Sequence, residues 1–307
     1  MAYDLAGKLV VGIASSALFD LAESDRVFRE QGEDAYRDYQ EAHLDDTLAP
    51  GVAFPFIRRL LSLNELTTGD EPIVEVIIMS RNDPSTGLRV MRSIEAHHLG
   101  ITRAIFMQGR SPYKYIPALN MSLFLSGNSD DVREAIAMGF AAGHVIGTPA
   151  QDPEGKDLRI AFDFDGVLAD DTSEKIMQAE GLEAFQANEV ENAGVPMTEG
   201  RLAAFLRGIN RIQDLEEQLA EDQPTYNRRL HVAIVTARSA PAHERVVRTL
   251  KSWGLRVNDA FFLGGVEKAN VLEVLEPHIF FDDQMGHLEP VADQIPSVHI
   301  PFGITNA

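Results

Sequence analysis

An α/β fold built on parallel sheet is the fold class that this sequence predicts. Short apolar segments alternate along the chain with longer stretches of helical periodicity, and polar residues directly follow several apolar segments. Neighbouring parallel strands need crossover connections, usually helices, and these cover both faces of the sheet. The alternation therefore favours parallel strands buried between layers of helices.

Eight apolar segments carry the strand signal. They span 8–14, 74–80, 101–107, 122–126, 159–164, 231–236, 260–264 and 278–283. Between two of them, residues 241–254 predict a helix that covers the sheet. Val246, Leu250 and Trp253 lie on one stripe of that helix, and Gly254 is the expected stop.

The two halves of the chain share one apolar pattern. Residues 76–109 align with residues 232–265 without a gap, at an offset of 156. The first strands correspond at an offset of 149. Beyond residue 109, two extra residues in the first half align Lys114 with Lys268, and the offset is 156 again at Ser126 and Asp282. The aligned pairs include Ala14 with Asp163, Ser16 with Asp165, Lys114 with Lys268, and Ser126 with Asp282.

This correspondence favours a duplicated α/β unit whose N-terminal copy is catalytically silent. The alternative is that any two strand–helix–strand units look alike once they are aligned. We expect an N-terminal half at 1–145, with a helical insertion at about 20–70. A catalytic half at 158–307 would carry a helical cap insertion at about 172–229. The stretch 144–157, which contains Pro, Gly and several acids, is the expected junction.

Helical spacing of apolar residues supports both insertions. It is clearest at 201–222 in the second half, and residues 23–43 and 53–66 occupy the equivalent place in the first. Each insertion follows the first strand of its half, so we expect it to lie over the strand ends as a cap. The apolar stripes are expected to be packing faces.

Composition excludes several classes of function. With 47 acidic against 27 basic residues, the formal net charge is −20, so we expect no nucleic-acid partner and no membrane surface. The absence of cysteine excludes disulfides, thiolate metal sites and a cysteine nucleophile. The first twenty residues lack the features of a signal or a membrane span, which predicts a cytoplasmic protein. The nine histidines, His287 among them, show no zinc-site spacing, and we expect surface or packing roles for them.

Polar side chains follow the strands of the second half at one edge of the expected sheet. In open α/β sheets the reactive crevice lies beyond the carboxyl ends of the strands. All four predicted strands of this half deliver polar groups there. The residues are Asp163 and Asp165, Thr236, Lys268, and Asp282 with Asp283.

A hard divalent cation would resolve the crowding of these carboxylates, because like charges otherwise raise each other's pKa. Mg²⁺ prefers oxygen ligands and commonly takes one or two carboxylates, waters and a substrate phosphate. Asp163 and one of Asp282 or Asp283 would be its protein ligands. Thr236 as a hydrogen-bond donor and Lys268 as a point charge would complete a site for a phosphoryl group.

The spacing of Asp163 and Asp165 predicts a different chemical role for each acid. Side chains at i and i+2 of an extended segment point to the same side, so both acids can face one phosphorus while Phe164 turns into the core. Attack by Asp163 would form an aspartyl-phosphate. Asp165 would protonate the leaving oxygen and later deprotonate water. Gly166 lets the chain turn away.

These residues carry a family resemblance. The stretches AFDFDGVLADD, IVTARS, GGVEK and IFFDDQ resemble, in order and spacing, the four motifs of haloacid dehalogenase-type phosphatases. The resemblance implies a haloacid dehalogenase-like sheet with helical caps. It also implies Asp163 as nucleophile, Asp165 as acid/base and as a metal ligand through its backbone carbonyl, Thr236, Ala237 and Lys268 as phosphate-binding residues, and Asp282 or Asp283 as a metal ligand.

A second resemblance covers nearly the whole chain. Segments such as FREQGEDAYRDYQEAH, PGVAFPFIRRL, DDVREAIAMGFAAG and PHIFFDDQM are similar to those of the cytosolic 5′-nucleotidases of type I. This implies a Mg²⁺-dependent enzyme that hydrolyses nucleoside 5′-monophosphates such as AMP. A homo-oligomer is compatible with the sequence, which does not determine the oligomeric state.

Two other functions stay open at this point. One keeps the site but acts on another small phosphate ester, such as a sugar phosphate, or transfers the phosphoryl group. The other is a nucleotide-sensing protein without catalysis. Weaker candidates for substrate or anion contacts are Arg238, Ser80, Arg81, Asn82, Lys114 and Phe56.

Overall fold

The structure is a computed structural model that describes residues 3–67, 69, 71–149 and 155–303. Its strands form one ten-stranded sheet in the order β3-β2-β1-β4-β5-β10-β9-β6-β7-β8. The strands are β1 (Leu9–Ile13), β2 (Val74–Ser80), β3 (Arg103–Phe106), β4 (Leu123–Ser126), β5 (Ala142–Ile146), β6 (Leu158–Phe162), β7 (Leu230–Thr236), β8 (Asp259–Phe262), β9 (Ile279–Asp282) and β10 (Ser297–His299).

Parallel pairing dominates this sheet, as the sequence predicts. Among the described residues, β5 and β10 pair antiparallel in the middle, and the other neighbouring strands pair parallel. β1, β2, β4 and β9 are buried along their whole length, because helices cover the sheet on both faces. The prediction of a mixed α/β fold is confirmed.

Helices connect the strands and form two long insertions. The α-helices of the described residues are α1 (Ser15–Leu18), α2 (Ala22–Ala42), α3 (Phe54–Ser62), α4 (Gly87–Ala96), α5 (Ser129–Ala137), α6 (Thr172–Glu191), α7 (Ala203–Asp222), α8 (His243–Trp253), α9 (Lys268–Leu275) and α10 (Met285–Leu288). Short 3₁₀ turns occur at η1 (Leu63–Leu66), η2 (Tyr113–Tyr115) and η3 (Pro117–Leu119). The helices predicted at 201–222 and 241–254 are present as α7 and α8.

Two strands, β5 and β10, were not predicted from the sequence. β5 occupies residues 142–146, so the expected junction at 144–157 begins inside a strand, and residues 150–154 of that stretch lie outside the described residues. β10 has three residues and is too short to give a periodic signal. Together these two strands join the halves of the sheet.

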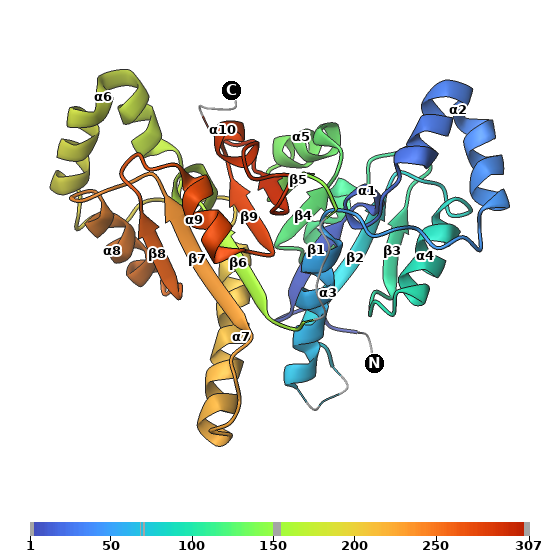
Figure 1. The fold of residues 1–307 in the computed structure, drawn as a ribbon, viewed down its shortest axis with the longest axis horizontal. Helices are drawn as coiled ribbons and strands as arrows, with labels where there is room; N and C mark the ends of the chain where they lie inside the picture. The colour runs from blue at the N-terminus through green and yellow to red at the C-terminus, as the bar shows by residue number, and fades with distance from the viewer. Residues whose placement is uncertain (1–2, 68, 70, 150–154, 304–307) are drawn as a thin grey trace.

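The two halves have the same strand order. Counted from the outer edge, the first half reads β3-β2-β1-β4-β5 and the second reads β8-β7-β6-β9-β10. In Figure 1, α2 and α6 stand above opposite ends of the sheet, and α3 and α7 extend below its centre. Both α2 and α6 bend at a glycine with positive φ, Gly32 at 87° and Gly181 at 83°.

One continuous hydrophobic core serves both halves. Its buried residues come from β1 and β2 as well as from β6, β7 and β9. α3 packs against β6, and α7 packs against β1, so each half covers part of the other. Between the halves, the largely buried Arg229 donates from Nη2 to the carbonyl oxygen of Ser62 at 3.2 Å. The division into domains at 1–145 and 158–307 stays a prediction.

Two glycines are required at equivalent points of the halves, just before α3 and α7. A Cβ at Gly200 would lie 2.4 Å from the carbonyl oxygen of Ala169, and one at Gly51 would lie 2.9 Å from that of Ala17. We expect Gly200→Ala and Gly51→Ala each to lower the free energy of unfolding by about 1–3 kcal/mol, because the backbone they meet cannot move away cheaply.

Urea unfolding of the variants measures this effect. Gly194→Ala is the matched control, because a Cβ there meets nothing within 4 Å. The control should be neutral or slightly stabilising. Equal stability of Gly200→Ala and Gly194→Ala would contradict the close approach.

Candidate active site

Three buried carboxylates meet at the ends of two neighbouring strands. Asp163 follows β6, Asp282 ends β9, and Asp283 comes directly after it. β6 and β9 are parallel with Phe162 opposite Phe281, which brings the acids side by side. One oxygen from each of the three carboxylates lies within 4.8 Å of the others. This geometry could hold a metal ion.

Lys268 lies between two of these acids. It is the first residue of α9, and its side chain is buried. Its Nζ lies 2.9 Å from Oδ1 of Asp163 and 2.7 Å from Oδ2 of Asp282. Burial lowers the pKa of a lysine, but these two carboxylates outweigh it and raise the pKa of Lys268 above its usual range. The lysine is therefore a fixed positive charge in the site.

One lysine does not neutralise the cluster. Burial raises the pKa of Asp163 from 3.8 to about 7; Lys268 opposes this rise, and the carboxylates of Asp282 and Asp165 add to it. The pKa of Asp282 is lowered: burial acts against this, but Lys268 and His287 outweigh it. Such a site holds an excess of negative charge that a divalent cation would compensate.

Thr236 and Ala237 lie at the end of the next strand and directly after it. Thr236 is the last residue of β7, which pairs with β6, and its side chain is buried. Its Oγ1 accepts a hydrogen bond from the backbone N–H of Arg238 at 3.3 Å. Ala237 is exposed at the start of the following loop. Both residues thus lie at the sheet edge where the sequence placed phosphate binding.

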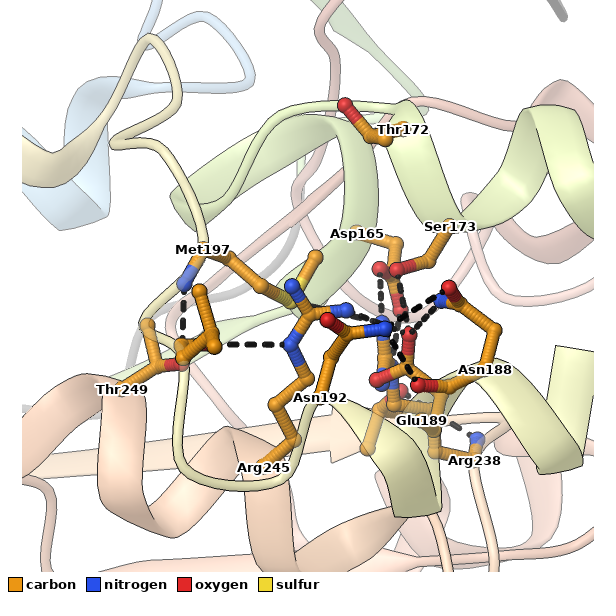
Figure 2. Close-up of polar contacts among 12 residues, drawn as sticks. Asp165, Thr172, Ser173, Asn188, Glu189, Asn192, Met197, Arg238, Arg245 and Thr249 are labelled. Atoms are coloured by element: carbon orange, nitrogen blue, oxygen red, sulfur yellow. Dashed lines mark hydrogen bonds and ion pairs between the residues drawn. The ribbon is translucent and has the colours of Figure 1, made fainter.

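Asp165 has a different partner from Asp163. It lies in the turn η4 (Phe164–Leu168), where Gly166 takes a φ of 72° and Phe164 is buried in the core. The guanidinium of Arg238 grips the Asp165 carboxylate with two hydrogen bonds, from Nε at 2.6 Å and from Nη2 at 2.7 Å. Figure 2 shows this pair beside Ser173 and Glu189 of the cap helix α6. Arg238, predicted as a weak substrate contact, is here a partner of Asp165.

The other weak candidates lie in the N-terminal half and separate into two groups. Ser80, Arg81 and Asn82 line a cavity of about 820 Å³ that also includes Ala14 and Ser16. Arg81 already pairs with Asp131 at 3.0 Å and with Glu134 at 2.6 Å. Arg81 is therefore already paired with two acids and does not offer a free positive charge to an anion.

Lys114 and Phe56 do not line this cavity. Lys114 is exposed in η2, with its Nζ 5.2 Å from the ring centroid of Tyr115, and does not line the cavity. It lacks the buried position of its aligned counterpart Lys268. Phe56 lies on the apolar stripe of α3, which packs inward, so its side chain is completely buried in the hydrophobic core.

Two residues that contact acids, His287 and Arg245, were not assigned these contacts from the sequence. His287 was expected on the surface or in packing, but its Nδ1 lies 3.1 Å from Oδ2 of Asp282. Arg245 holds the cap through Glu189 at 2.8 Å. A lone histidine or arginine on a helix gives no signal of its own, so only the fold identifies these contacts.

Comparison with known proteins places the chain. The model of the 5′-nucleotidase family matches residues 1–307, the whole chain. The chain belongs to the 5′-nucleotidase family. Human cytosolic 5′-nucleotidase 1B is 32% identical over 292 residues, which cover 92% of this chain and 47% of the human protein. The chain thus spans about half the length of this relative. Across the described residues, none of the helices is long and apolar enough to span a membrane.

The raised pKa of Asp163 predicts a pH-dependent loss of stability without metal. The folded protein keeps a proton on Asp163 that the unfolded chain releases, so wild type loses stability as the pH rises from about 4 to about 7. Asp163→Asn has no such proton. We expect the variant to gain about 1–3 kcal/mol of unfolding free energy relative to wild type between pH 4.5 and pH 8.

Urea unfolding in EDTA at several pH values tests this expectation. Asp222→Asn, at an exposed position at the end of α7, is the control and should follow the wild-type curve. Parallel curves for wild type and Asp163→Asn would show that the carboxylate is not under strain in the fold.

Proposed function

We propose that this protein is a 5′-nucleotidase that hydrolyses nucleoside 5′-monophosphates, AMP among them, to nucleoside and phosphate. The observation that carries the proposal is the buried grouping of Asp163, Lys268 and Asp282 at adjoining strand ends, in a chain of the 5′-nucleotidase family. The name of the human relative supports the substrate class and a cytoplasmic location.

Mg²⁺ is the proposed cofactor, and the residues present fit it. Asp163 with Asp282 or Asp283 would supply carboxylate oxygens, and Asp165 its backbone carbonyl. The raised pKa of Asp163 supports a cation here, because burial and the neighbouring acids leave the site short of positive charge. When bound, the ion neutralises charge on the phosphoryl oxygens and makes the phosphorus more open to attack.

The residues of the chain divide the reaction into two steps. A carboxylate oxygen of Asp163 attacks phosphorus, the bond to the ribose O5′ breaks, and Asp165 gives that oxygen a proton. Water then attacks the aspartyl-phosphate, Asp165 takes a proton from that water, and Asp163 and phosphate are released. Lys268 and Thr236 hold the phosphoryl oxygens throughout.

We also infer that the N-terminal half is a catalytically silent copy of the same unit. The matching strand orders and the kinks at Gly32 and Gly181 support a duplication. In the silent half, Ala14 and Ser126 stand where Asp163 and Asp282 stand in the other, so the metal ligands are missing from it. Its role would be to complete the shared core.

A phosphate-release assay tests the function. We expect wild type to hydrolyse nucleoside 5′-monophosphates in preference to sugar phosphates, and EDTA to abolish this activity. Asp163→Asn should lose at least about 10³-fold in kcat, because the nucleophile is gone. Asp222→Asn serves again as the neutral control.

Different failures of this assay point to different errors. Hydrolysis of sugar phosphates alone would refute the nucleotidase activity, and phosphoryl transfer to an added nucleoside would show a phosphotransferase. Nucleotide binding without phosphate release would indicate the sensing function. Unchanged turnover in Asp163→Asn would refute the aspartyl-phosphate mechanism.

A further inference from the structure

Glu189 is a buried acid on the cap helix α6 that the reaction above does not use. Its carboxylate accepts hydrogen bonds from Ser173 at 2.8 Å and Asn188 at 3.1 Å and pairs with Arg245 at 2.8 Å. It also pairs with Nη1 of Arg238, and Figure 2 shows these side chains close together. The carboxylate is 0% exposed, so it is removed from water completely.

Arg238 connects this acid to the tip of β6. Its Nη1 faces Glu189, while its Nε and Nη2 hold both oxygens of Asp165. A guanidinium that bonds a carboxylate in two places fixes the plane of that carboxylate as well as its position. The chain Asp165–Arg238–Glu189 therefore runs from the proposed acid/base to the cap.

The N-terminal half provides an internal comparison for these three charges. At the aligned positions it has Ser16 for Asp165, Asn82 for Arg238 and Gln40 for Glu189. All three ions are replaced by neutral polar residues in the half that lacks the catalytic acids. The charges are thus present together or absent together.

The contacts that hold the cap are nevertheless kept in both halves. Arg89 donates from Nη1 to Gln40 at 3.2 Å, where Arg245 contacts Glu189 in the other half. A second pair of equivalent bonds joins the segment after each cap helix to α4 in the first half and to α8 in the second. Ser93 Oγ in α4 accepts from Leu48 N at 3.0 Å, and Thr249 Oγ1 in α8 accepts from Met197 N at 3.2 Å. A glutamine is therefore enough to attach a cap of this kind.

We infer that Glu189 is a positioning residue, which through Arg238 fixes the carboxylate of Asp165 for the proton transfer from water. A buried ion pair often adds no stability over well-packed neutral partners, and Gln40 makes the equivalent contact without a charge, so the charge at position 189 points to a role beyond attachment of the cap. The inference rests on the proposed phosphatase mechanism, but it does not depend on which phosphate ester is the substrate.

The variant Glu189→Gln tests this inference, with Gln40→Glu as its mirror in the silent half. Glutamine keeps the size of the side chain and the contact that Gln40 makes to Arg89. The substrate is p-nitrophenyl phosphate, whose phenolate leaves without a proton, so that turnover reports the step in which Asp165 takes a proton from water. We expect Glu189→Gln to lower kcat about tenfold with little change in KM, and Gln40→Glu to match wild type.

A double-mutant cycle shows whether Glu189 acts through Asp165. In the Asp165→Asn background, Glu189→Gln should cause no further loss of kcat, because the group it positions no longer accepts the proton. If the loss of kcat in the double variant equals the product of the two single losses, Glu189 acts on the fold of the cap and not through Asp165, and the inference is overturned. Unchanged kcat in Glu189→Gln alone would also overturn it.

A crystal structure of metal-free Glu189→Gln gives a result that does not depend on activity. We expect the guanidinium of Arg238 to lose at least one of its two hydrogen bonds to the carboxylate of Asp165. Retention of both bonds at their present geometry would refute the inference. A wild type that hydrolyses p-nitrophenyl phosphate but no nucleotide would refute the nucleotidase proposal alone, and if wild type hydrolyses neither ester, this crystal structure decides.

Discussion

A buried excess of negative charge at the end of β6 is the constraint on which the rest of the site depends. Asp163, Asp282 and Asp283 are all nearly inaccessible to water, and Lys268 is the buried cation that contacts two of them. Carboxylates removed from water are unfavourable unless they are compensated. The apolar strands of the sheet hold them there regardless, because the surrounding core is large and continuous through both halves.

The parallel sheet explains how residues so far apart in sequence reach one point. β6, β7 and β9 are neighbours with the same direction, so their final residues lie at a common edge. The turn after β6 then separates the two acids of the first motif. Asp163 faces Lys268, and Asp165 faces Arg238, so the two acids have different cationic partners. Two carboxylates two positions apart can therefore perform different tasks.

The sequence predicted most of this arrangement, and the omissions have physical reasons. The strands and the helices at 201–222 and 241–254 were readable, because buried runs and helical stripes are local signals. β5 and β10 were not, because one contains Gly and His and the other has three residues. The motif acids could be placed at the sheet edge, but the contact of His287 with Asp282 depends on how α10 packs. Lys114 aligned with Lys268 and yet lies exposed, since sequence register alone does not fix the direction of a side chain in a short 3₁₀ turn.

The comparison between the halves separates what the fold needs from what the chemistry needs. Both halves keep the strand order, the kinked cap helix and the arginine that attaches it, so these features belong to the architecture. The ions Asp165, Arg238 and Glu189 appear in one half, and their aligned partners are neutral. Because each of these charges is buried or nearly so, none can be attributed to solubility. Their joint absence from the half that lacks counterparts of Asp163 and Asp282 supports the proposed connection, through the guanidinium of Arg238, between the cap and proton transfer at Asp165.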